Sequence, residues 1–72
     1  MSNPYALFVY NFKSLDGLEV GADYFNILKT GKLPEQVANE ANAKLKAISK
    51  AKQYVITDFR VSHDETQRFL KF

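Results

Sequence analysis

The side chains that could support catalysis or hold a metal are few and poorly spaced for either role. Ser62, His63 and Asp64 are the residue types of a catalytic triad, but consecutive residues cannot converge as a triad requires. His63 is the only histidine, and with Asp64 and Glu65 it offers too few ligands for a closed zinc site. We therefore expect His63 to lie in a solvent-exposed turn, and we expect no metal.

Other catalytic signatures are missing from the sequence. The chain has no cysteine, which excludes disulfides, thiolate metal clusters and a cysteine nucleophile. Its three glycines lie too far apart for a phosphate-binding loop. Asp58 lies within an apolar segment, but the sequence identifies no second carboxylate to work with it. We therefore predict that the protein is not an enzyme and uses no cofactor.

Length and composition indicate one small globular domain over residues 1–72. Hydrophobic residues make up 46% of the chain, six Phe and four Tyr are present, and the formal net charge is +2. Such a chain has enough apolar surface to fold. Its longest apolar run, residues 5–12, is too short for a membrane helix and lacks the flanks of a signal peptide. We expect no membrane partner and a cytoplasmic location.

The first third of the chain contains strand and turn signals. Residues 5–12 are aromatic and β-branched, which predicts a strand. Asp16-Gly17 is a strong turn signal, and residues 18–20 fit a short second strand. Residues 22–30 fit either a short helix ending at Gly31 or an extension of that strand, because Tyr24, Ile27 and Leu28 have helical spacing. We expect the helix or an irregular turn.

The clearest element is a helix over residues 34–52. Pro34 suits the first helical position, where its missing N–H has no partner, and Glu35 complements the positive helix start. An apolar stripe then recurs at spacings of four, four and three residues. It consists of Val37, Ala41, Leu45 and Ile48.

The last third of the chain predicts a strand over residues 54–61. Simple alternation places Val55, Thr57, Phe59 and Val61 on one face of it and Tyr54, Ile56, Asp58 and Arg60 on the other. Residues 67–72 fit a final strand, with a helical turn from Glu65 as the alternative. These elements predict an α+β fold in β-β-α-β-β order. Its sheet would be antiparallel or mixed, with three or four strands, and the one main helix would cover one face.

The first strand is apolar on both of its faces. Phe8, Tyr10 and Phe12 point one way, while Tyr5, Leu7 and Val9 point the other. One helix covers only one face of a sheet, so something else must cover the second face, or that face is exposed. The candidates are residues 22–30, a second copy of the chain and a different partner. An exposed apolar face of this kind is typical of an interaction site.

These surfaces predict a small protein-interaction module of the accessory or inhibitor type. It would act through an aromatic and basic sheet face or edge, and a second copy of the chain is one candidate partner. Tyr and Arg are favoured anchors at protein interfaces. The partner-binding residues that we predict are Tyr10, Tyr54, Ile56, Arg60 and Arg68.

Nucleic-acid binding is the alternative function. Lys44, Lys46, Lys50 and Lys52 fall within nine residues that contain no acid. The run from Leu7 to Phe12 resembles the first-strand signature of RNA-recognition motif domains, and that resemblance implies that Phe8 stacks on a base. The second signature of that family matches only at Lys52, Tyr54 and Phe59, so we do not assign the chain to it.

Overall fold

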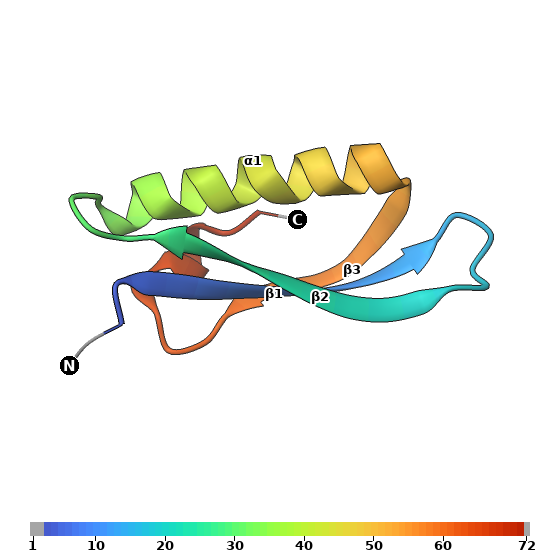
Figure 1. Cartoon of the computed structure of the whole chain (residues 1–72), viewed down its shortest axis with the longest axis horizontal. Helices are drawn as coiled ribbons and strands as arrows, with labels where there is room; N and C mark the ends of the chain where they lie inside the picture. The colour runs from blue at the N-terminus through green and yellow to red at the C-terminus, as the bar shows by residue number, and fades with distance from the viewer. Residues whose placement is uncertain (1–2, 72) are drawn as a thin grey trace.

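The computed structural model describes residues 3–71, which form an antiparallel sheet with one long helix on one face (Figure 1). The bounds are Tyr5–Ser14 for β1, Val20–Leu28 for β2, Pro34–Lys52 for α1, Tyr54–Val61 for β3 and Glu65–Phe69 for the 3₁₀-helix η1. The predicted α+β fold with one main helix is confirmed. The predicted order is matched only in part, because the described chain has three strands in β-β-α-β order.

The sheet has the order β2-β1-β3, so the apolar first strand lies in its centre. β1 pairs antiparallel with both neighbours, and the register with β2 joins Tyr5 to Leu28 and Lys13 to Val20. Our expectation of a helix or irregular turn at residues 22–30 was wrong, because β2 continues to Leu28. The helical spacing of the apolar residues in that segment is only a weak local preference. Pairing with β1 outweighs it, because the pairing satisfies the backbone N–H and C=O groups of β2 along the strand.

The helix α1 has the bounds that the sequence predicts. The amide of Leu33 donates to Oε1 of Gln36 at 2.8 Å, which closes half of a capping box at the helix start. Gln53 ends the helix in the left-handed conformation, with φ of 56°. The predicted apolar stripe faces the sheet, and Val37, Ala41 and Leu45 are buried there.

A β-bulge in β3 overturns the predicted alternation of that strand. Asn11 pairs with Asp58 but Phe12 pairs with Ile56, so Thr57 is an extra residue between them. The extra residue reverses which side of the sheet each later side chain occupies. Phe59 and Val61 therefore point toward α1, and so do Tyr54 and Ile56, which precede the bulge.

Aromatic rings from all three strands fill the space between the sheet and α1. Phe8 is fully buried, with its ring centroid 5.5 Å from that of Phe25 and 5.9 Å from that of Phe59. The rings of Phe12 and Tyr54 stack at 3.9 Å. Such ring pairs contribute beyond the area they bury. The core therefore lies entirely on the helix side of the sheet.

The C-terminal segment forms the helical turn that was the alternative prediction, not a final strand. The carboxylate of Asp64 accepts from the amide of Thr66 at 2.9 Å, and this caps η1. Nδ2 of Asn42 donates to the carbonyl of Phe69, and Oδ1 of Asn42 accepts from the amide of Lys71 at 2.9 Å. These bonds attach the C-terminal segment to α1, so the segment does not pair with the edge of the sheet. Phe72, which the predicted strand included, lies outside the described residues.

Candidate protein-binding surface

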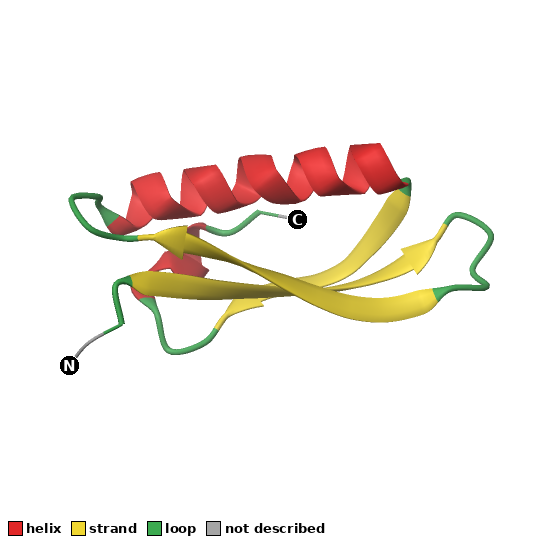
Figure 2. Ribbon diagram, viewed as in Figure 1, coloured by secondary structure: helices red, strands yellow, loops and turns green. Residues whose placement is uncertain are grey.

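The face of the sheet opposite α1 carries a group of exposed apolar side chains, which we call the outer-face patch. Figure 2 shows α1 on one side of the sheet, and among residues 3–71 no helix or strand packs on the other. The register brings these side chains together, since Tyr5 lies opposite Leu28 and Val9 lies opposite Tyr24. The outer-face patch consists of Tyr5, Leu7, Val9, Tyr24 and Leu28.

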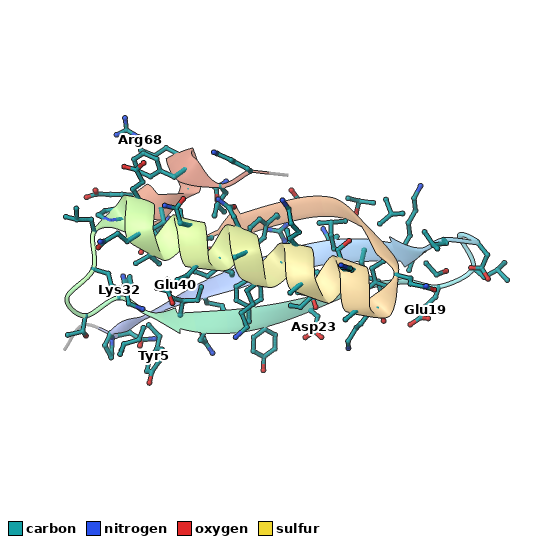
Figure 3. The ribbon with its side chains drawn as sticks, turned by 90° about the horizontal axis from the view of Figure 1, so that it is seen from above. Tyr5, Glu19, Asp23, Lys32, Glu40 and Arg68 are labelled. Atoms are coloured by element: carbon teal, nitrogen blue, oxygen red, sulfur yellow. The ribbon has the colours of Figure 1, made fainter. Side chains whose placement is uncertain are left out.

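The exposure of the outer-face patch is large for apolar side chains. Tyr24 is 63% exposed, Tyr5 49%, Leu7 46% and Leu28 42%, while Val9 in the centre is half-buried by its neighbours. Tyr5 also points outward at the edge of the molecule in Figure 3. The prediction that one helix cannot cover both faces of the first strand is confirmed. Residues 22–30 do not cover the second face, because they extend it.

Polar residues lie within and beside the outer-face patch on the same side of the sheet. Asn26 lies opposite Leu7, and Arg60 lies opposite Val9 on the other flank of β1. The guanidinium of Arg60 forms an ion pair with the carboxylate of Asp58. This ion pair accommodates the charge of Asp58 within a largely apolar strand. An apolar centre with a polar rim is the usual anatomy of a protein interface.

Three of the predicted partner-binding residues lie in the wrong place for an exposed sheet face. Tyr10 is only 2% exposed and belongs to the core, where burial first and the facing carboxylate of Asp23 second raise its pKa. Tyr54 and Ile56 are half-buried and pack against the core. Tyr10 shares its side with the buried residues of β1, and the bulge turns Tyr54 and Ile56 inward.

The two predicted arginines are both exposed but are not brought together on the sheet. Arg60 lies on the outer face beside the patch, as predicted. Arg68 is on η1, which packs against α1, and it points away from the body of the protein in Figure 3. Its guanidinium lies 5.3 Å from the ring centroid of Phe69. The strand that would have placed Arg68 on the sheet does not form among the described residues.

The predicted nucleic-acid-binding residues also fall into a buried and an exposed group. Phe8 has no exposed surface, so its ring is inaccessible to a base. The four lysines of α1 are all exposed. Two of them rest on aromatic rings: Lys44 Nζ lies 5.3 Å from the Phe25 centroid, and Lys52 Nζ lies 6.0 Å from that of Tyr54. These contacts give both lysines a local structural role.

The predicted exposed turn at His63 is confirmed, and His63 adopts φ of 51° there. The neighbouring carboxylate of Asp64 pairs with Lys29 at 2.9 Å. The Thr66 amide, and after it Lys29, hold the pKa of Asp64 below its usual value. Within residues 3–71, no three His, Asp or Glu side chains gather as metal ligands would. No helix of that range has the length and hydropathy needed to cross a membrane.

Sequence reasoning found three of the five residues of the outer-face patch. The apolar second face of the first strand was visible as Tyr5, Leu7 and Val9, whereas Tyr24 and Leu28 were missed because their segment was assigned to a helix. The signal that could have found them is the Asp16-Gly17 turn, since a hairpin at that point pairs the following residues with β1. Comparisons with protein families, with curated proteins and with solved structures gave no match for this chain.

Proposed function

We propose that the protein is a non-enzymatic protein-interaction module, of the accessory or inhibitor type, that binds a protein partner through the outer-face patch. The observation that carries this proposal is the group of five apolar side chains on a sheet face that no described element covers. In a globular domain, a contiguous exposed apolar surface is more typical of an interaction site than of a surface without a binding role.

The size of the face suits a partner of modest area. Strands spaced by about 4.8 Å, with a rise of about 3.3 Å per residue, give a three-stranded face of roughly 14 Å by 30 Å. That product, about 420 Å², is about half of the roughly 800 Å² that each partner contributes to a standard interface. The face therefore supports a specific but small interface.

The composition of the outer-face patch favours a protein over a nucleic acid. Its centre is aliphatic, with Leu7 and Val9 between the two tyrosines, and aliphatic side chains offer a base no stacking surface. A net charge of +2 is small for a surface that would neutralise several phosphates. The exposed lysines of α1 are the observation that favours nucleic-acid binding as the second candidate, and α1 covers the face of the sheet opposite the patch.

Photo-crosslinking from two matched positions tests the proposal. A photoreactive phenylalanine analogue replaces Tyr24 in the outer-face patch or Lys50 on the exposed face of α1, and crosslinks form in cells that naturally express the protein. We expect discrete protein adducts from position 24 and few from position 50, because only the first position lies in the proposed interface. Adducts from position 50 alone would refute the assignment of the outer-face patch.

A salt-dependent titration tests the second candidate. Single- and double-stranded oligonucleotides are titrated at low and at high salt, with the wild-type protein and with a variant in which Lys44, Lys46, Lys50 and Lys52 are all replaced by Gln. We expect no binding at low salt, where the electrostatic term is strongest. Tight binding that the lysine variant loses would favour the nucleic-acid function instead.

A further inference from the structure

The turn between β1 and β2 carries two leucines that make no contribution to the core. Leu15 is 70% exposed and Leu18 is 88% exposed, although turns normally hold polar residues and glycine. The turn extends past the C-terminal end of α1, so these leucines lie at one end of the elongated molecule (Figure 1). We call residues 15–19 the leucine tip.

Hydrogen bonds hold the leucine tip in one conformation. The amide of Leu18 donates to Oδ1 of Asp16 at 3.0 Å, and the amide of Glu19 donates to Oγ of Ser14 at 3.0 Å. The Ser14 hydroxyl also donates to Asp16, and with the Leu18 amide it holds the pKa of Asp16 below its usual value. Gly17, at φ of 75°, makes the turn possible. A loop fixed in this way loses little entropy on binding.

An apolar groove lies between α1 and the edge of β3. It has a volume of about 630 Å³ and includes Leu45, Val55 and Ile56 in its lining. Hydrogen bonds fix both of its ends: Asn42 holds the amide of Lys71, and Oγ of Ser49 donates to the carbonyl of Tyr54 at 2.7 Å. The groove is therefore built into the fold and is open to an apolar insert.

The charges on the leucine tip and the groove are opposite. Asp16 and Glu19 flank the two leucines, and Figure 3 shows Glu19 beside the projecting turn. The described residues that line the groove include Lys46 and Lys71 and no carboxylate. The tip thus combines apolar side chains with negative charge, and the groove combines an apolar lining with positive charge. Complementarity of this kind favours correct pairing of two surfaces.

We propose that the leucine tip of one copy of this chain inserts into the α1–β3 groove of a second copy. Leu15 and Leu18 occupy the apolar lining, and the carboxylates of Asp16 and Glu19 lie near the ammonium groups of Lys46 and Lys71. This contact uses neither the outer-face patch nor its partner. A test of the contact is therefore independent of a test of the proposed function. The acidic flanks disfavour insertion of the tip into an anionic lipid surface.

Mass measurement by light scattering and sedimentation tests the pairing. Wild-type protein is measured up to about 1 mM, where even a weak contact populates the pair. We expect its mass to rise with concentration above the 8.2 kDa of one chain. The variant Leu18→Asp disables the tip, and Ala43→Glu, at an exposed helix position in the groove lining, disables the groove. Each change should raise the dissociation constant at least tenfold.

Matched controls separate this contact from unspecific association. Leu33→Asp, at another leucine that is 66% exposed, should associate as the wild type does, and so should Leu7→Asp in the outer-face patch. A mixture of the Leu18→Asp and Ala43→Glu variants should form mixed pairs, since one supplies an intact groove and the other an intact tip. The double exchange Glu19→Lys with Lys46→Glu should restore an association that each change weakens alone at low salt.

Three results would overturn the pairing. The first is a wild-type mass of one chain at every concentration. The second is an association that Leu18→Asp leaves unchanged while Leu7→Asp abolishes it, which would place the contact on the outer-face patch. The third is a mixture of the tip and groove variants that forms no pairs although both variants keep the circular dichroism of the folded wild type.

Discussion

Leu7 and Phe8 are consecutive residues on opposite sides of the central strand, and their replacement separates the cost of the outer face from that of the core. Phe8 has no exposed surface and packs between Phe25 and Phe59, so Phe8→Ala leaves a cavity and should cost about 3–5 kcal/mol. Leu7 is 46% exposed. Leu7→Ala removes three carbons of which about half the surface is buried, at about 0.8 kcal/mol per buried group, so it should cost about 1 kcal/mol.

Urea unfolding followed by circular dichroism measures both costs. A domain of 72 residues with a typical stability per residue unfolds at about 4–11 kcal/mol, so Phe8→Ala should remove at least about a quarter of that stability and should lower the urea midpoint strongly. Leu7→Ala should fold cooperatively, with a modestly lower midpoint and an unchanged slope. The measurements use dilute protein, so that association between chains does not stabilise the folded state.

The result that would refute this reasoning is a loss of about 3 kcal/mol or more for Leu7→Ala. A loss of that size requires full burial of the leucine side chain. The outer face would then be covered in the free protein, and the outer-face patch would be part of its core. Tyr24→Ala on the neighbouring strand is a second probe of the same face, and it should be as mild as Leu7→Ala.

Three further predictions concern the fold. Gly21→Ala should cost about 1–3 kcal/mol in urea unfolding, because the added Cβ would come 2.8 Å from Cζ of Phe12; an unchanged midpoint would contradict that close approach. Gln53→Gly should raise the stability by up to about 1 kcal/mol, because Gln53 ends α1 at φ of 56°, and a lower thermal midpoint would argue against the left-handed cap. The lowered pKa of Asp64 means that its charged form stabilises the fold above the unfolded pKa of about 3.9, and this contribution disappears as the pH falls through the lower folded value. Asp64→Asn should therefore flatten the acid limb of a pH series of urea midpoints, and parallel curves for variant and wild type would contradict the role of the Thr66 amide.

The helix was predictable because its signals are local. Pro34 and the apolar stripe of Val37, Ala41 and Leu45 determine where α1 begins and which face it buries, and the structure agrees with both. The backbone hydrogen bonds of a helix form within the helix itself, so the residues of that segment largely determine where the helix forms.

The second strand was not predictable in the same way, because its partner determines it. Tyr24, Ile27 and Leu28 have the spacing of a helix, yet all three lie in a strand that pairs with β1. Two of the five outer-face patch residues belong to that strand, so the local ambiguity that hid the strand also hid these two residues of the candidate site.

The bulge in β3 explains why the predicted interface residues do not share one face of the sheet. Strict alternation placed Tyr54, Ile56 and Arg60 on one face, and one extra residue at Thr57 divides them between two. Neither glycine nor proline lies within β3 to mark the bulge, so alternation alone gave the wrong side for the residues before it.

The most direct test of the outer-face patch is competition for the crosslink from position 24. Purified wild-type protein, Leu7→Asp and Lys50→Asp are each added in excess to a lysate of the same cells before irradiation, and the yield of the adduct is measured. We predict that wild-type protein and Lys50→Asp suppress the adduct equally, while Leu7→Asp needs at least about tenfold more protein, equivalent to about 1.4 kcal/mol of lost binding. Equal suppression by Leu7→Asp and the wild type would contradict the proposal that this face binds the partner.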